Sequence, residues 1–151
     1  MVVAIIQARM SSTRLPGKVL MKVGNKVLLD YMIKRVRKSE LIDKVVIATT
    51  INPSDDKIED FCVNNSIDYF RGSENDVLDR YYFSAKEFNA QTIVRMTSDC
   101  PLIDPFVIDE TIKLYLHKKV DYAANTCPPD IKKYPDGSDV EVFGFSNLEK
   151  I

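Results

Sequence analysis

The N-terminal segment combines residue types that bind anionic groups. An apolar run over residues 2–7 leads directly into a loop with three cations, Arg9, Arg14 and Lys18. Small residues stand between the cations, so backbone N–H groups can converge on an anion without interference from bulky side chains: Ser11, Ser12, Thr13 and Gly17. We interpret the loop as the triphosphate-binding loop of a nucleotidyltransferase. A solvated basic turn is the alternative interpretation.

The spacing of this loop excludes two common phosphate-binding motifs. The loop lacks both the G-x-x-x-x-G-K-[ST] pattern of P-loop proteins and the G-x-G-x-x-G pattern of dinucleotide-binding proteins. The sequence therefore disfavours a kinase and a Rossmann dinucleotide-binding protein.

One carboxylate is placed to complement the cations. Asp99 follows a predicted strand over residues 91–97, and ligands of open α/β sheets bind at the carboxyl ends of strands. Magnesium in proteins takes one or two carboxylates and completes its shell with water and phosphate oxygens. Asp99 is therefore a candidate magnesium ligand, although it could instead hold the turn before Pro101. Asp104, which precedes Pro105, is better explained as a helix N-cap.

Two further polar segments follow or enter predicted strands. Strand periodicity over residues 139–144 places Asp139 and Glu141 on one face, where they could bind sugar hydroxyls or a metal, or form the solvated side of an edge strand. Residues 71–76 follow another strand and could frame a nucleobase, although a turn with a helix cap explains them equally well.

Apolar runs of strand length alternate with segments of helical period, which is typical of βαβ units around a mostly parallel, buried sheet. We expect an α/β fold with strands at 2–7, 44–49, 68–71, 91–97, 121–125 and 139–144. We expect four helices: one over 27–38, one capped by Ser54, one that begins at Asn75 or Asp76, and one from Asp104–Pro105 to about Leu116. The third should present an apolar stripe to the core: Val77, Leu78, Tyr81, Tyr82, Ala85 and Phe88.

The segment 126–138 contains Cys-Pro-Pro-Asp and Tyr-Pro-Asp-Gly turns and is a candidate substrate lid. We find no repeat and no linker, so we expect a single domain over residues 1–151.

Composition limits the classes of function. The chain has 151 residues, 45% of them apolar, and a net charge of -1, which argues against a general nucleic-acid-binding protein. It has no run of about eighteen apolar residues and no signal-peptide pattern, so we expect a cytoplasmic protein without a membrane segment. Three widely spaced cysteines and a single histidine, His117, favour neither a disulfide framework nor a zinc site.

Taken together, these residues resemble the cytidylyltransferase family that includes the acylneuraminate and deoxyoctulosonate cytidylyltransferases, and most closely its branch associated with spore-coat polysaccharide synthesis. The matching stretches are 6–18, 46–50 with 53–56, 71–74 with 76–81, 95–105, and 136–137 with 139–143. They follow one another in the family's order over nearly the whole chain.

The resemblance implies a three-layer nucleotide-diphospho-sugar transferase fold of the Rossmann-like type, with a mostly parallel sheet and helices on both faces. It implies transfer of CMP from CTP to a sugar or sugar acid with release of pyrophosphate, a Mg²⁺ cofactor bound by Asp99, and a possible homodimer. Such enzymes continue beyond this point, so the chain is expected to cover about the first two thirds of one and to be truncated at its C-terminal side.

The resemblance also assigns roles to individual residues. Arg9, Lys18 and Asp99 would be catalytic, and Asp139 and Glu141 would bind the sugar. The nucleotide would be bound by Ala8, Arg9, Ser11, Ser12, Arg14, Lys18 and Ser73, with Ser73 near the cytosine. Two alternatives stay open: a nucleotidyltransferase that uses another nucleotide or a phosphorylated alcohol, and a non-catalytic nucleotide-binding or dimerisation module.

Overall fold

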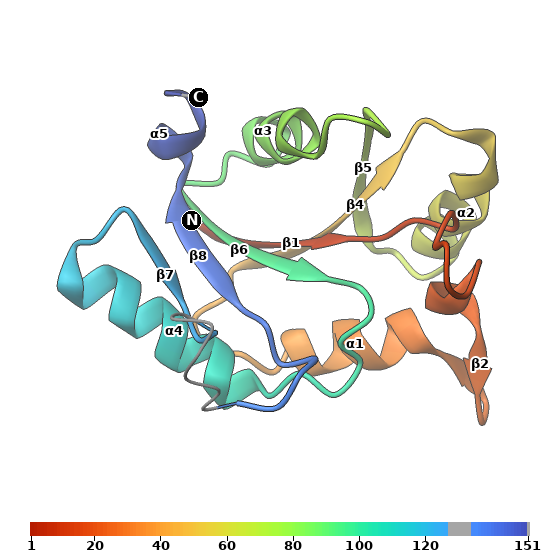
Figure 1. The fold of residues 1–151 in the computed structure, drawn as a ribbon, viewed down its shortest axis with the longest axis horizontal. Helices are drawn as coiled ribbons and strands as arrows, with labels where there is room; N and C mark the ends of the chain where they lie inside the picture. The colour runs from red at the N-terminus through yellow and green to blue at the C-terminus, as the bar shows by residue number, and fades with distance from the viewer. Residues whose placement is uncertain (127–133, 151) are drawn as a thin grey trace.

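A six-stranded sheet forms the centre of the molecule (Figure 1). A computed structural model describes residues 1–126 and 134–150 of the chain. The strands lie in the order β5 (Asp68–Gly72), β4 (Lys44–Thr50), β1 (Val2–Gln7), β6 (Thr92–Thr97), β8 (Glu141–Gly144) and β7 (Tyr122–Ala124). The first four are parallel, and β8 is antiparallel to both of its neighbours. The predicted mostly parallel α/β sheet is confirmed.

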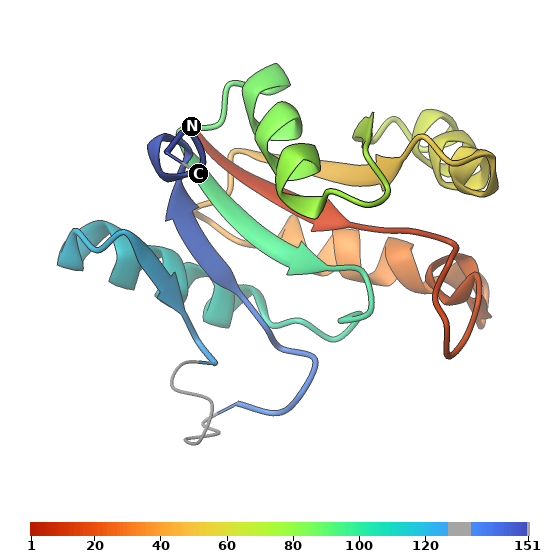
Figure 2. The ribbon, with the colours of Figure 1, turned by 45° about the horizontal axis from the view of Figure 1, so that its top comes forward.

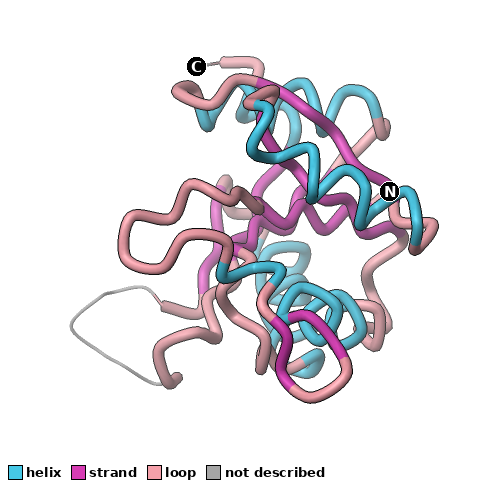
Figure 3. The backbone as a smooth tube through the Cα atoms, turned by 90° about the vertical axis from the view of Figure 1, so that its right-hand side faces the viewer, coloured by secondary structure: helices cyan, strands magenta, loops and turns pink. Residues whose placement is uncertain are grey.

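Helices cover both faces of this sheet, which gives the expected three layers (Figure 3). Helices α1 (Leu28–Val36), α2 (Asp56–Asn64) and α4 (Pro105–Lys118) contribute to one core, and α3 (Val77–Glu87) and α5 (Phe145–Leu148) contribute to the other. Strand β1 serves both cores because its side chains alternate: Ala4 and Ile6 face the first, and Val3 and Ile5 face the second.

The helical periods seen in the sequence account for most of these helices. Four apolar residues that recur at helical spacing in α1 are buried: Leu29, Met32, Ile33 and Val36. Leu28, at the start of this helix, is half-buried. Asp104 caps α4, as expected, by accepting a hydrogen bond from the backbone N–H of Phe106 at 2.9 Å. A short hairpin of β2 (Lys22–Val23) and β3 (Lys26–Val27) was not predicted, because each strand has only two residues.

The predicted cap of the second helix is wrong, because the N-cap position of α2 is Asp55 and no side chain caps it. Asn52, not Ser54, accepts the capping hydrogen bond of the helical turn before α2, and the donor is the backbone N–H of Ser54 itself at 2.9 Å. A turn of 3₁₀ helix over Pro53–Asp55 then precedes α2. The proline favours the first position of a helical turn, which moves the cap back to Asn52.

The start of α3 is predicted correctly, since Asp76 accepts a hydrogen bond from the N–H of Asp79 at 2.9 Å. The predicted apolar stripe is wrong at Leu78, which is exposed, whereas Arg80 and Ser84 are buried.

The last strand begins two residues later than expected, at Glu141. The side chain of Asn125 provides the reason, because its amide donates to the carbonyl of Ser138 at 2.6 Å and its oxygen accepts from the N–H of Val140 at 2.9 Å. A side chain thus takes hydrogen bonds that a longer strand pair would form. Strands β7 and β8 lie side by side at one edge of the sheet (Figure 2).

Residues 127–133 of the predicted substrate lid lie outside the described residues. None of the helices in the described part of the chain combines the length and the apolar composition required to cross a bilayer.

Candidate functional site

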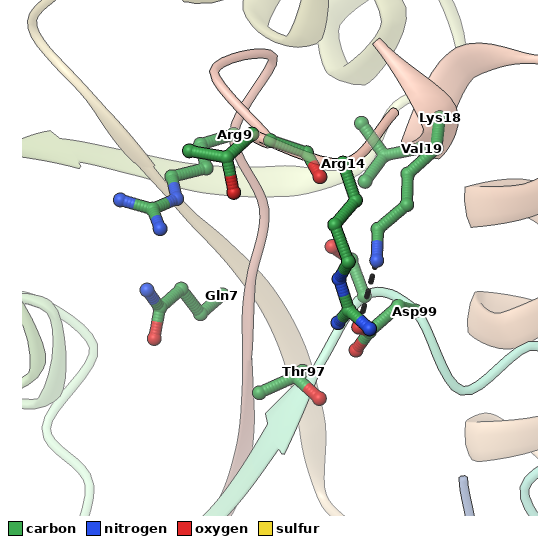
Figure 4. Close-up of a pocket in the computed structure, with 10 residues that line it drawn as sticks. Gln7, Arg9, Arg14, Lys18, Val19, Thr97 and Asp99 are labelled. Atoms are coloured by element: carbon green, nitrogen blue, oxygen red, sulfur yellow. Dashed lines mark hydrogen bonds and ion pairs between the residues drawn. The ribbon is translucent and has the colours of Figure 1, made fainter. Parts of the chain in front are cut away.

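A polar pocket lies where β1 and β6 end. Its volume is about 260 Å³. The lining side chains come from the two strand ends and from the loop that follows β1: Gln7, Arg9, Ser12, Thr13, Arg14, Lys18, Val19, Thr97, Ser98 and Asp99 (Figure 4). This is the strand edge at which open α/β sheets bind ligands. The structure therefore brings all three predicted cations and the predicted metal ligand to one pocket.

The loop after β1 closes on itself through its backbone. Gly17 donates its N–H to the carbonyl of Met10 at 2.8 Å and has a φ of 72°, in the left-handed region that disfavours residues with a Cβ. A 3₁₀ turn over Lys18–Leu20 follows at once. This reversal returns Lys18 toward the end of β6.

Lys18 and Asp99 form an ion pair with an Nζ–Oδ2 distance of 2.8 Å. The hydrogen bond from Lys18 holds the pKa of the Asp99 carboxyl below its ordinary value, partial burial opposes this, and a hydrogen bond from Thr97 adds to the lowering. The Asp99 side chain is 41% exposed. Asp99 is therefore an ionised carboxylate that a ligand can reach.

The two arginines of the loop differ in direction. The side chains of Arg14 and Lys18 point toward Asp99, whereas that of Arg9 points away from it (Figure 4). Within the described residues, no hydrogen bond or ion pair engages the guanidinium groups of Arg9 and Arg14, and both residues are exposed. Both groups are thus available to an anion that enters the pocket.

The residues around Asp99 fit a magnesium ion that also binds phosphate. Within the described residues, no group of three or more His, Cys, Asp or Glu residues could hold a metal ion by itself. Magnesium does not need such a cage, because one carboxylate with phosphate and water oxygens completes its shell. A single accessible carboxylate beside a cationic loop matches that requirement.

Asp55 fixes the start of the loop after β1 through its carboxylate, and this role could not be predicted from the sequence. Its carboxylate is 1% exposed and accepts hydrogen bonds from the N–H of Met10 at 2.7 Å and from the hydroxyl of Thr50 at 2.5 Å. In the sequence, Asp55 directly follows the predicted helix cap Ser54, where a carboxylate can simply favour the positive end of the helix dipole. No pattern in a single sequence distinguishes these two roles, because the contact with Met10 spans 45 residues.

Two of the residues predicted to bind the nucleotide lie along the same strand edge but outside the pocket. Ser11 donates from its hydroxyl to Glu74 at 3.4 Å, and Glu74 also accepts from the side-chain amide of Asn52 at 2.8 Å. These contacts join the loops that follow β1, β4 and β5. Ser73, beside Glu74, accepts a hydrogen bond at its hydroxyl from the N–H of Asp76 at 3.0 Å.

Ala8, also predicted to bind the nucleotide, extends the pairing of β1 with β4 by one residue. It is buried, and its N–H donates to the carbonyl of Ala48 at 3.1 Å. Ser12 lines the polar pocket.

The guanidinium of Arg71 is fully engaged by neighbouring groups. It forms ion pairs with Asp56, at 2.7 Å, and with Glu59, and it donates to the carbonyls of Thr50 and Asn52. In this structure Arg71 therefore ties β5 to the segment before α2 and to α2 itself.

Neither of the two predicted sugar-binding acids lines the polar pocket, although Asp139 lies beside Cys100, the residue after Asp99. Asp139 is exposed and precedes β8, and the alternation of burial from Asp139 to Val142 agrees with the predicted common face of Asp139 and Glu141. Glu141 forms an ion pair with Arg95 across the β6–β8 pair. Val140 and Val142 are buried on the opposite side, as predicted.

Comparison with known proteins identifies one family. Residues 3–143 match the profile of the cytidylyltransferases. The chain is similar to the spore coat polysaccharide biosynthesis protein SpsF of Bacillus subtilis, with 43% identity over 122 residues that cover 78% of this chain and 51% of that protein. It is also similar to the solved structure of a cytidylyltransferase from Leptospira borgpetersenii, with 40% identity, a TM-score of 0.90, and coverage of 99% of this chain and 62% of the other.

A more distant structure shows the fold alone. The CMP:2-keto-3-deoxy-manno-octonic acid synthetase, solved in complex with CTP, has 16% identity and a TM-score of 0.80 over 99% of this chain and 76% of its own. The predicted nucleotide-diphospho-sugar transferase fold is confirmed. The chain spans between half and two thirds of the length of SpsF and of the Leptospira protein.

Proposed function

Because the chain belongs to the cytidylyltransferase family, we propose that its polar pocket binds the triphosphate of CTP for transfer of CMP to a sugar oxygen with release of pyrophosphate. One observation carries the proposal: Arg14 and Lys18 point toward an accessible, ionised Asp99 at the carboxyl ends of β1 and β6. A triphosphate supplies the negative charge that such a pair of cations binds, and the synthetase of the same fold was solved with CTP.

In the proposed reaction, an acceptor oxygen attacks the α-phosphorus of CTP in line with the leaving group. A bond forms between this oxygen and phosphorus, and the bond from phosphorus to the oxygen that bridges to the β-phosphate breaks. Pyrophosphate leaves with the electron pair, and the acceptor's hydroxyl proton passes to solvent. Arg14 and Lys18 would neutralise the charge that develops on the leaving group.

In the pocket without a ligand, the charge of Lys18 is neutralised by its ion pair with Asp99. When a triphosphate binds, its oxygens can replace Asp99 as acceptors for Lys18, and Asp99 then becomes available to a metal ion. A magnesium ion held there would add positive charge next to the phosphates. The remaining assignments are that Ser73 lies near the cytosine, that Arg9 contacts the nucleotide, and that Asp139 and Glu141 lie near the sugar.

We also propose that the sugar product serves surface polysaccharide synthesis. The support is the likeness to SpsF, whose name assigns that protein to spore coat polysaccharide biosynthesis.

Calorimetry with CTP and magnesium tests the cation site. Lys18→Ala should weaken CTP binding about tenfold or more, because a charge-assisted hydrogen bond is lost. Lys22→Ala is the matched control, since Lys22 is exposed on β2 and outside the pocket. Equal CTP affinity in the wild type and Lys18→Ala would contradict the proposal.

A second measurement separates CTP from the other nucleotides. A ligand that binds the folded state raises the melting temperature by mass action, so CTP with magnesium should give a larger shift than UTP, GTP or ATP. A larger shift with another nucleotide would favour the nucleotidyltransferase of different specificity. Pyrophosphate release in the presence of candidate sugars distinguishes an enzyme from a binding module.

A further inference from the structure

A second cavity, of about 500 Å³, lies on the face of the sheet that α3 and α5 cover. Its lining is mainly apolar and aromatic but includes one ion pair: Leu78, Tyr81, Arg95, Tyr122, Glu141 and Phe143. A volume between roughly 300 and 1,000 Å³ with a few polar groups in apolar walls is typical of small-molecule sites.

This cavity adjoins the polar pocket through β6. Arg95 lines the cavity and Thr97 lines the polar pocket, and residues two apart on a strand share a face about 7 Å from each other. Across the sheet, the loop with Ser73 follows β5, the cationic loop follows β1, and the cavity lies over β6 and β8. A CTP with its base near Ser73 would therefore have its phosphates between the base and this cavity.

The charges of the cavity disfavour an anionic ligand. Arg95 is already paired with Glu141, and Asp121 adds a second carboxylate to the lining. The three groups leave a net charge of -1, and a carboxylate that entered would find no unpaired cation among them. An uncharged molecule with hydroxyl groups can instead donate to Glu141 and accept from Arg95, whose side chains are 24% and 32% exposed.

The aromatic walls suit a ring with an apolar face. Tyr122 stacks on Phe143 with ring centroids 6.5 Å apart, and Arg95 lies 5.8 Å from the centre of the Tyr81 ring. The C–H face of a pyranose is apolar while its rim carries hydroxyls, so one ring can contact the aromatic side chains and the ion pair together.

We propose that this cavity is the acceptor site and that the acceptor is an uncharged sugar, not a sugar acid. The inference rests on the proposed function, because a reacting hydroxyl has to lie within about 3.5 Å of the α-phosphorus before the bond forms. It adds Leu78, Tyr81, Tyr122 and Phe143 to the residues that select the acceptor.

Saturation-transfer NMR of the wild-type chain tests this assignment with defined probes. The probes are the methyl pyranosides of glucose, galactose and mannose, each compared with its uronic acid counterpart, in the presence of CTP and magnesium. We expect ring-proton signals from at least one uncharged glycoside, at least threefold stronger than from its uronate. Leu78→Ala and Tyr122→Ala should each reduce that signal at least threefold.

Two controls show whether a lost signal comes from the cavity and not from unfolding. Leu78 and Tyr122 are 43% and 47% exposed, so their truncation should leave the fold intact, and a thermal melt checks this. Leu114→Ala changes an equally exposed apolar residue of α4 outside the cavity and should leave the signal unchanged. Equal signals from a glycoside and its uronate, signals unchanged by both cavity variants, or no signal from any uncharged glycoside would overturn the proposal.

Two outcomes separate this inference from the proposed function. Glycoside binding that depends on Tyr122, together with unchanged CTP affinity in Lys18→Ala, would remove the CTP site and keep a sugar site. CTP binding that Lys18→Ala weakens as expected, without binding of any glycoside, would keep the CTP site and remove the sugar site. If Tyr122→Ala instead lowers the mass measured by sedimentation, a second copy of the chain occupies the cavity and the acceptor assignment fails.

Discussion

Arg14, in the loop after β1, and Arg71, near the end of β5, both lie toward the carboxyl edge of the sheet, yet their guanidinium groups have different surroundings. Arg71 has two carboxylates within ion-pairing distance, on Asp56 and Glu59, and donates to two backbone carbonyls. Arg14 is exposed and directed toward the Lys18–Asp99 pair. The same residue type therefore serves packing at the end of β5 and is available to a ligand in the loop after β1.

The difference arises from the acidic residues of α2, which precedes β5 in the chain and packs beside it. Asp56 and Glu59 are three residues apart in the first turn of α2, so both carboxylates lie on the side of the helix that meets β5. The loop after β1 is followed by a 3₁₀ turn whose first turn has no acidic residue. A cation near a strand end is thus a better candidate ligand-binding residue when no helix packed beside it offers carboxylates.

The largest effect is expected at Asp55, on which the position of the ligand-binding loop depends. Asp55→Ala should lower the free energy of unfolding by about 3 kcal/mol, because a buried carboxylate with several donors is removed, and it should also weaken CTP binding. Chemical denaturation and calorimetry measure the two effects. Ser54→Ala, a neighbouring exposed residue, is the control, and a loss of less than about 1 kcal/mol at Asp55 would contradict the supporting role.

Replacing each of the two arginines in turn by methionine tests the comparison directly. Arg71→Met should cost about 1–2 kcal/mol of unfolding free energy and leave CTP affinity unchanged. Arg14→Met should reduce CTP affinity about tenfold and change stability by less than about 0.5 kcal/mol. Each variant is the control for the other, and the comparison fails if both lose the same property.

The smallest effect concerns the pH dependence of the Lys18–Asp99 pair. The folded-state pKa of Asp99 lies below its ordinary value of 3.8, so the pair's stabilisation is present above that value and is lost as pH falls through the lowered pKa. The stability difference between the wild type and Asp99→Asn should therefore shrink below about pH 4. Lys18→Met should abolish the same dependence, and a difference that stays constant down to pH 2 would show that the pair is not coupled.

Local patterns in the sequence predicted the elements whose signals are periodic. Helix α1, the caps at Asp76 and Asp104, and the four parallel strands depend on spacings within a few residues, so they could be identified. The end of β7 and the start of β8 could not, because the Asn125 side chain replaces backbone pairing across a gap of 13 to 15 residues.

The candidate site shows the same limit. The cationic loop and Asp99 were recognised because strand ends at the carboxyl edge converge in any parallel sheet. The long-range partners were not: Asp55 reaches Met10, and Arg95 pairs with Glu141 across 46 residues. A carboxylate that accepts a hydrogen bond from a buried backbone N–H and a carboxylate that faces a ligand are the same residue type in a sequence. They differ in burial, which depends on the folded chain.

The amide of Asn125 has a consequence for how this chain can vary. By bonding to the carbonyl of Ser138 and to the N–H of Val140, on either side of Asp139, it helps fix which residues of β7 and β8 face each other. A homologue that keeps an asparagine at this position would therefore keep the alignment of these two strands, so a single amide side chain is a point on which the geometry of this sheet edge depends.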